Sequence, residues 1–283
     1  MNHETALSKA REIADSVLAP AARQNDKEGR FSTEAVDALG RAGFLGLMLP
    51  TAFGGTALGP RTFAAVIATL AEADASVAMV YLMHICASAT IAAARPGSAV
   101  AEILKEIASG GHLSTLAFSE AGSRSHFWAP VSRARPNGKG VLITAKKSWV
   151  TSAGCAQSYV VSSLAPEGTG PTDSTLYLVP AGVRGLSAEG SWDGLGLRAN
   201  ASAPMVLDDC EVPYELQLTN DGAGFQAMRY RWVDRVCIFF AVNVWINGVV
   251  AQPGEPGINR NIEIRIDANP LEASIPDIAI DIS

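Results

Sequence analysis

The sequence predicts an α+β protein in which an all-helical N-terminal domain precedes an antiparallel β-sandwich or barrel domain and a short atypical tail. Apolar residues recur at three-and-four spacing up to Gly110, which is the helical pattern. From His112 onward, short β-branched runs alternate with turn clusters, which is typical of antiparallel strands. Past Met228 this organisation is lost except for a strand-like alternation of Ile262, Ile264 and Ile266, so one more strand plus disorder is expected there. We therefore expect a helical domain over residues 1–111, a β domain over residues 112–218, and the start of a helix and a tail over residues 219–283.

Composition narrows the class of protein. The chain has 283 residues, a net charge of −6 and no basic stripe, so a nucleic-acid partner is not expected. Its cysteines and histidines lack the spacing of metal ligands, and the cysteines form no disulfide framework. The N-terminus lacks the basic start and unbroken apolar run of a signal peptide, so we expect a cytoplasmic location.

The helical domain should contain several amphipathic helices. The first has its apolar face over residues 6–18 and is expected to end near Pro20. Ser32 is placed to cap the second, which stops around residues 40–43, and Pro60 suits the first turn of the third. A last helix should begin at Ser98 and stop at Gly110.

The stretch from Ser76 to Ala94 is nearly free of charge and long enough to be tested as a membrane span. Alanine and scattered polar residues interrupt it, so a helix buried on all sides is the favoured interpretation. Either Asp74 or Ser76 could cap this helix, and His84 within it is expected to be a hydrogen-bonded core residue.

The β domain is expected to use several short strands. Their ranges are Leu113–Phe118, Val131–Ala134, Val141–Thr144, Ser158–Leu164, Thr175–Val179 and Met205–Leu207. A further helix could begin near Phe225, but the preceding Gly-x-Gly is a poor phosphate loop because no strand leads into it.

The stretch from Leu116 to Thr151 is the candidate binding region. Both of its ends read as strands that stop at hydroxyl-rich turns, and Trp149 lies in the second. A flat heterocycle needs an aromatic face and short hydrogen-bond donors at its edge, which these residues could supply. Taken alone, the same residues also fit ordinary sheet.

The order of these elements resembles the acyl-CoA dehydrogenase family, whose members join an N-terminal helical domain, a middle β domain and a C-terminal helical bundle. Five passages in order carry the likeness: residues 46–55, 116–122, 147–151, 194–199 and 208–213. Together they cover residues 1 to about 228 of the chain.

The resemblance implies FAD as cofactor. It places the backbone and hydroxyls near Phe118 and Ser119 at the pyrimidine side, Trp149 on the isoalloxazine, and Thr151 near the reactive N5. Ser125 would lie near the pyrophosphate and the acyl-CoA thioester, as both a cofactor and a substrate contact. The cofactor-binding residues implied are Leu116, Phe118, Ser119, Ser125, Trp149, Val150 and Thr151.

The resemblance also implies an activity in fatty acid metabolism: α,β-dehydrogenation of an acyl-CoA thioester with hydride transfer to FAD. Family members pass electrons to an acceptor flavoprotein and form homo-oligomers, which is open for this chain. Nothing after Met228 resembles the bundle that supplies the catalytic carboxylate, so no catalytic residue is assigned. We therefore expect a truncated or rearranged member.

The chain departs from the family pattern at one turn. Ala121 replaces the usual proline, and residues 123–126 replace the usual turn that ends in aspartate. This leaves two alternatives open: a flavin-dependent monooxygenase of the same fold, and a non-catalytic remnant with exposed apolar faces.

Overall fold

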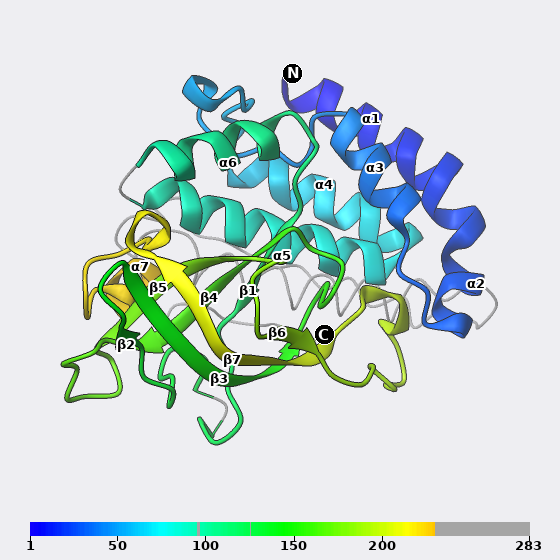
Figure 1. Cartoon of the computed structure of the whole chain (residues 1–283). Helices are drawn as coiled ribbons and strands as arrows, with labels where there is room; N and C mark the ends of the chain where they lie inside the picture. Colours follow the sequence, from blue (N-terminus) through cyan, green and yellow to red (C-terminus); the bar gives the residue numbers. More distant parts are fainter. Residues whose placement is uncertain (95–96, 125, 230–283) are drawn as a thin grey trace, which may run out of the picture.

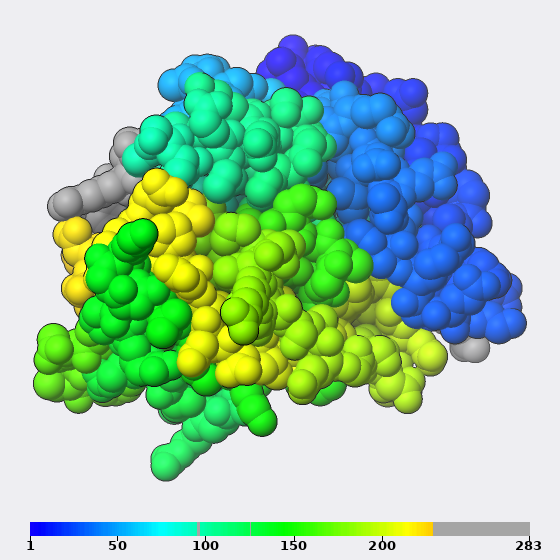
Figure 2. All heavy atoms as spheres, in the orientation of Figure 1, coloured from blue at the N-terminus to red at the C-terminus, as the bar shows by residue number. Residues whose placement is uncertain are grey.

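The computed structural model describes residues 1–94, 97–124 and 126–229. It has two layers, with helices packed on one side of a pair of β-sheets (Figure 1). The atoms of the two layers meet along a continuous boundary on the face shown in Figure 2. The α+β class is confirmed, and the expected tail beyond residue 229 lies outside the described residues.

The helices are α1 (His3–Ile13), α2 (Ala19–Glu28), α3 (Thr33–Arg41), α4 (Pro60–Ala73), α5 (Ala75–Ala93), α6 (Ser98–Ala108) and α7 (Gly224–Arg229). The expected end near Pro20 is wrong, because a π-helical turn, Ala14–Leu18, joins α1 directly to α2. Pro20 lies in the first turn of α2, where its missing N–H costs little. The chain leaves the helix at Gly29, which has a left-handed φ of 63°.

Side-chain caps fix the starts of the next helices as expected. The Ser32 hydroxyl accepts a hydrogen bond from the Ala35 N–H at 3.3 Å. The Asp74 carboxylate, rather than Ser76, caps α5 by accepting from the Val77 N–H at 3.0 Å. Pro60 is the first residue of α4.

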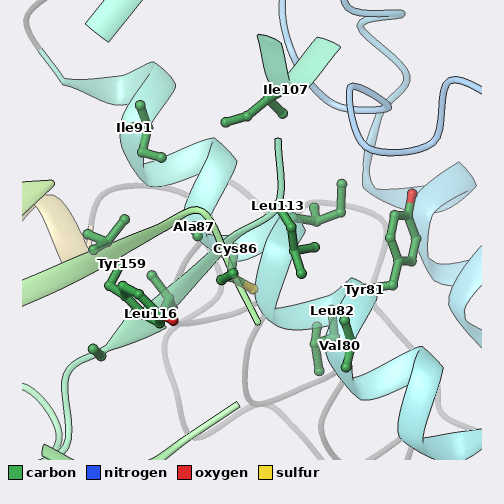
Figure 3. Packing of buried hydrophobic residues seen from close by; sticks show 14 of the residues in the cluster. Val80, Tyr81, Leu82, Cys86, Ala87, Ile91, Ile107, Leu113, Leu116 and Tyr159 are labelled. Carbon is green, nitrogen blue, oxygen red and sulfur yellow. The ribbon is translucent and has the colours of Figure 1, made fainter. Parts of the chain in front are cut away.

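Helix α5 is the centre of the core. It is the one described helix long and apolar enough to cross a membrane, but 72% of its most apolar window is buried inside the structure. Figure 3 shows Leu113, Leu116 and Tyr159 from the β layer packing near its side chains. The helix therefore joins the two layers through one continuous apolar cluster.

His84 is fully buried in α5 and hydrogen-bonded at both ring nitrogens, as expected of a core histidine. Its Nε2 lies 3.0 Å from the Leu45 carbonyl, and its Nδ1 accepts from the Ser114 N–H at 3.0 Å. Burial lowers the pKa of His84 to about 4. The neutral ring thus connects the helical layer to the first strand.

The seven strands within the described residues form two sheets, with the orders β1-β4-β5 and β2-β3-β7-β6. Their bounds are β1 (Ser114–Ala117), β2 (Arg135–Pro136), β3 (Gly140–Val150), β4 (Ser158–Leu164), β5 (Ser174–Pro180), β6 (Leu186–Ala188) and β7 (Ala203–Pro213).

The strands differ in several ways from those that the sequence predicts. β1 and β4 pair in parallel, and neither described sheet closes into a barrel. Residues 131–134 make only an isolated bridge at Arg133, because Val131 and Ser132 donate their N–H groups to the Glu120 carboxylate instead. Strand β6 is too short and too polar to show an alternating pattern, so the sequence did not reveal it.

Candidate functional site

The two stretches predicted to hold a cofactor lie side by side in the structure. Just past the end of β1, the Ser119 carbonyl accepts a hydrogen bond from the Ser148 N–H of β3 at 2.9 Å. The Ala121 N–H donates to the Lys146 carbonyl at 3.1 Å, which places Glu120 opposite Lys147. Residues 119–121 and 146–148 therefore form one local ribbon.

Strand β3 bends immediately after this ribbon. Its register with β7 shifts between Lys147 and Val150, and Trp149 has a φ of +52°. A bulge re-aims side chains, and a left-handed conformation at a residue other than glycine costs on the order of 1–2 kcal/mol. Such strain often lies at binding sites. The result is a tryptophan that remains 54% exposed.

Trp149 has an aromatic neighbour from a distant loop. The rings of Trp149 and Trp192 lie 5.0 Å apart in an edge-to-face arrangement, at 82°. Trp192 is fixed in turn by a hydrogen bond from its Nε1 to the Gly196 carbonyl at 2.8 Å. The pair forms a partly exposed aromatic surface, which is suited to a flat ring.

Polar groups near the bend are incompletely paired. The N–H of Ser119 donates to no atom of the described residues. Among the described residues, the Thr151 hydroxyl has one hydrogen-bond partner, the Ser202 hydroxyl at 3.3 Å. The buried Ser152 hydroxyl has no hydrogen-bond partner among them. An exposed aromatic face beside unpaired donors fits the requirements of a flavin ring.

The remaining predicted contacts divide into two groups. The side chains of Leu116, Phe118 and Val150 are buried in the core, so only their backbone could face a ligand. Ser119 is half-buried and could present either its hydroxyl or its N–H. Ser125, the expected phosphate and thioester contact, lies outside the described residues.

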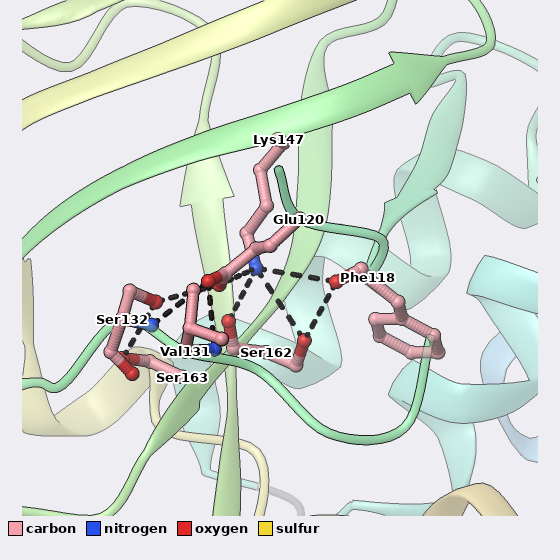
Figure 4. Close-up of polar contacts among 7 residues, drawn as sticks. All are labelled: Phe118, Glu120, Val131, Ser132, Lys147, Ser162 and Ser163. Atoms are coloured by element: carbon pink, nitrogen blue, oxygen red, sulfur yellow. Dashed lines mark hydrogen bonds and ion pairs between the residues drawn. The ribbon is translucent and has the colours of Figure 1, made fainter. Parts of the chain in front are cut away.

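A buried ion pair behind the ribbon was not predicted from the sequence. The Lys147 ammonium lies 2.6 Å from Oε1 of Glu120, and their side chains are 0% and 1% exposed (Figure 4). Burial lowers the pKa of Lys147, and the Glu120 carboxylate opposes that shift. Burial also acts to raise the pKa of Glu120, but the ammonium and the hydrogen bonds from Ser132 outweigh it, so the net shift is downward.

The sequence did contain a signal for this pair. Val141, Ile143 and Ala145 alternate onto the buried face of β3, and Lys147 occupies the next position on that face. A charged residue at an inward position requires a buried partner. The pattern could therefore have shown that Lys147 needs a buried partner, which the structure identifies as Glu120.

A second polar chain has a stabilising role. Glu106 Oε2 lies 3.1 Å from Nδ1 of His112, whose Nε2 lies 2.8 Å from the Ser158 hydroxyl. The order matches a serine–histidine–acid triad, but Ser158 is only 1% exposed and is also bonded to Ser114. It has no access to a substrate and instead links α6 to the β1–β4 pair. No described group of histidine, cysteine and acidic residues could hold a metal ion.

Comparison with family models matches both layers. The acyl-CoA dehydrogenase N-terminal domain matches residues 1–111, and the acyl-CoA dehydrogenase middle domain matches residues 115–210. Among curated relatives, the mitochondrial short-chain specific acyl-CoA dehydrogenase of Mus musculus is 27% identical over 79% of this chain and 55% of its own length. The mitochondrial isovaleryl-CoA dehydrogenase of Oryza sativa subsp. japonica is 27% identical over 76% of this chain and 54% of its own.

Solved structures share the fold. Butyryl-CoA dehydrogenase from Megasphaera elsdenii has a TM-score of 0.75 at 20% identity, over 88% of this chain and 64% of that one. An acyl-CoA dehydrogenase complexed with FAD from Bacillus anthracis has a TM-score of 0.79 at 19% identity, over 88% of this chain and 43% of that one. The chain spans about half the length of the curated relatives it matches.

Proposed function

The chain belongs to the acyl-CoA dehydrogenase family, and from this premise we propose that it binds FAD at the bend of β3 and acts in acyl-CoA dehydrogenation. The observation that carries the proposal is the exposed Trp149, held at a positive φ next to the ribbon formed by residues 119–121 and 146–148. Backbone strain of this kind clusters at ligand sites, and here it holds an exposed aromatic ring in place.

The residues at the bend divide the work of holding the ring. Trp149 supplies the stacking face, and the Thr151 hydroxyl supplies a short donor at the ring edge. The Ser119 hydroxyl and the N–H end of the peptide between Phe118 and Ser119 supply contacts at the pyrimidine side. FAD, when bound, supplies a hydride acceptor, and donors at its polar edge stabilise the negative charge that the ring gains.

Substrate and partner follow from the relatives. We propose an acyl-CoA thioester as substrate, because the curated relatives are named short-chain specific acyl-CoA and isovaleryl-CoA dehydrogenases. An electron-transferring flavoprotein is the proposed acceptor. The described residues provide no assigned base, so the α-proton must be removed by a group outside them. We also propose a cytoplasmic location, and the thiols of Cys155 and Cys210, which form no disulfide among the described residues, suit a reducing compartment.

The first test is the visible spectrum of the purified protein after FAD addition and gel filtration. The proposal expects a yellow protein, whereas a colourless, aggregated product would support the non-catalytic remnant. Anaerobic bleaching by a panel of acyl-CoA thioesters would then support dehydrogenation. Dependence on a separate flavin reductase and oxygen would favour the monooxygenase.

A matched pair of variants tests the placement of the ring. Trp149→Ala should reduce FAD retention strongly, because it removes the aromatic face. Arg124→Ala changes an exposed residue in the neighbouring turn and should leave retention near that of the wild type. Equal retention in both variants would count against the placement.

A further inference from the structure

We propose that Glu120 and Lys147 form a positioning pair that orients the peptide between Phe118 and Ser119 toward the polar edge of the flavin. The inference rests on the proposed FAD site and assigns a role there to two residues that do not touch the ring. Figure 4 shows the arrangement, with the Lys147 ammonium among acceptors from two separate segments, residues 118–120 and Ser162 of β4.

The Lys147 ammonium has buried acceptors on more than one element. Besides Glu120, the Lys147 Nζ donates to the Ser162 carbonyl at 2.6 Å and to the Phe118 carbonyl at 3.4 Å. The Ser162 hydroxyl also donates to the Phe118 carbonyl, at 3.3 Å. Two buried donors therefore hold the carbonyl of the residue that precedes Ser119.

The other end of the same peptide is the Ser119 N–H. The described residues contain no cis peptide bond, so the C=O of Phe118 and the N–H of Ser119 point in opposite directions. Because the carbonyl points toward the buried ammonium, the N–H points away from it. This is the N–H that finds no acceptor among the described residues. The ion pair thus presents a free backbone donor at the proposed pyrimidine side.

The buried contacts of Glu120 exclude a role in taking a proton from a substrate. Its Oε2 accepts from the N–H groups of Val131 and Ser132 at 2.9 and 2.8 Å, and its Oε1 accepts from the Ser132 hydroxyl at 2.6 Å. With Lys147 added, both oxygens are occupied, and the side chain is 1% exposed. Glu120 therefore holds Lys147 and the 131–132 backbone in place and cannot reach a substrate proton.

The presence of a charged pair on the buried face of β3 needs a reason other than stability. Replacement of a buried ion pair by neutral residues of similar volume is often neutral for stability, so stability alone does not require the charges. An apolar side chain, however, cannot donate to the Phe118 carbonyl. The requirement for a donor at that carbonyl accounts for a lysine on the buried face of β3.

The test uses the full chain and compares FAD affinity with thermal stability. The double variant Glu120→Gln with Lys147→Met removes both charges and the donor, while the carboxamide oxygen introduced by the first substitution remains an acceptor for Val131 and Ser132. We expect this double variant to melt close to the wild type and to bind FAD about tenfold or more weakly, the loss expected when the hydrogen bond from the Ser119 N–H to the ring is no longer held in place. The visible absorption band of any flavin that remains bound should also shift. Val66→Ala, a core change in α4 remote from Phe118, is the control and should lower the melting temperature without weakening FAD binding.

Each result has a distinct meaning. Wild-type affinity and an unshifted flavin spectrum in the double variant would overturn the positioning role and leave the FAD site intact. A wild-type chain that binds no FAD would overturn the proposed function itself. If the double variant does not fold, Ser162→Ala removes the other donor to the Phe118 carbonyl. It should weaken FAD binding several-fold while lowering the melting temperature no more than the Val66→Ala control does, and unchanged binding would overturn the inference.

Discussion

The inner and outer sides of β3 treat polar and strained groups in opposite ways. On the inner side, Lys147 is fully buried and hydrogen-bonded to Glu120, Phe118 and Ser162. On the outer side, two residues further along, Trp149 is exposed and holds a positive φ, beside a Ser119 N–H with no acceptor among the described residues. A fully hydrogen-bonded interior can therefore hold a strained and partly unpaired edge in position for a ligand.

The largest expected effect comes from breaking the inner side alone. Lys147→Met leaves the Glu120 carboxylate buried without its cation, which should lower the free energy of unfolding by about 3–5 kcal/mol. Urea denaturation measures this loss. The double variant with Glu120→Gln should recover most of it, and a loss below about 1 kcal/mol in the single variant would contradict a tightly coupled pair.

The next effect concerns pH and the buried His84. The unfolded chain takes up a proton at His84 near its ordinary pKa of 6.5, whereas the folded protein does so only near 4. Between these pH values the unfolded state binds more protons, so stability is full above pH 6.5 and falls as the pH falls, by about 3 kcal/mol in all. Urea denaturation at several pH values measures the slope.

His84→Gln is the control for this prediction. Glutamine keeps a donor and an acceptor but does not titrate, so the variant should show a shallower loss of stability between pH 6.5 and 4. Because it replaces a fully buried, hydrogen-bonded ring, the variant should also be less stable at neutral pH. An identical slope in both proteins would assign the acid sensitivity to other groups, such as His112, whose pKa burial also lowers.

A smaller effect on stability is expected on the outer side of β3, at Trp149. Glycine accepts a positive φ without strain, so Trp149→Gly should be more stable than Trp149→Ala by about 1 kcal/mol. Both variants should retain little FAD, because both lack the ring. A more stable alanine variant would show that the bend stores no strain, and thermal melts of the FAD-free proteins decide the matter.

The smallest effect is expected from the unpaired Ser152 hydroxyl. Ser152→Ala removes a group without a partner among the described residues and should change the free energy of unfolding by no more than about 0.5 kcal/mol. The matched change Ser158→Ala breaks hydrogen bonds to His112 and Ser114 and should cost about 1–3 kcal/mol. Equal losses would show that Ser152 is paired in solution.

Local features were predictable from the sequence. Ser32 and Asp74 cap helices because their side chains reach N–H groups three residues ahead, and the isolated His84 is a core residue. The strand ends at residues 118–120 and 147–151 were also located, although whether they hold FAD stays a prediction.

Long-range features were not predictable in the same way. The parallel pairing of β1 with β4 joins residues far apart in the chain, and the π-helical turn before Pro20 depends on packing against other helices. The Glu120–Lys147 pair was missed because the inward position of Lys147 indicates only that it needs a buried partner, and the partner, Glu120, is distant in sequence. The role of Ser125 stays a prediction, because Ser125 lies outside the described residues.

Hydrogen exchange with and without FAD tests most directly the claim that the outer edge binds the ring. Mass spectrometry of peptides covering residues 116–120 and 147–152 should show slower exchange when FAD is added. Peptides covering residues 131–134, on the inner side, should be unchanged because the Val131 and Ser132 N–H groups are already bonded. FAD bound without protection of residues 147–152 would contradict the account.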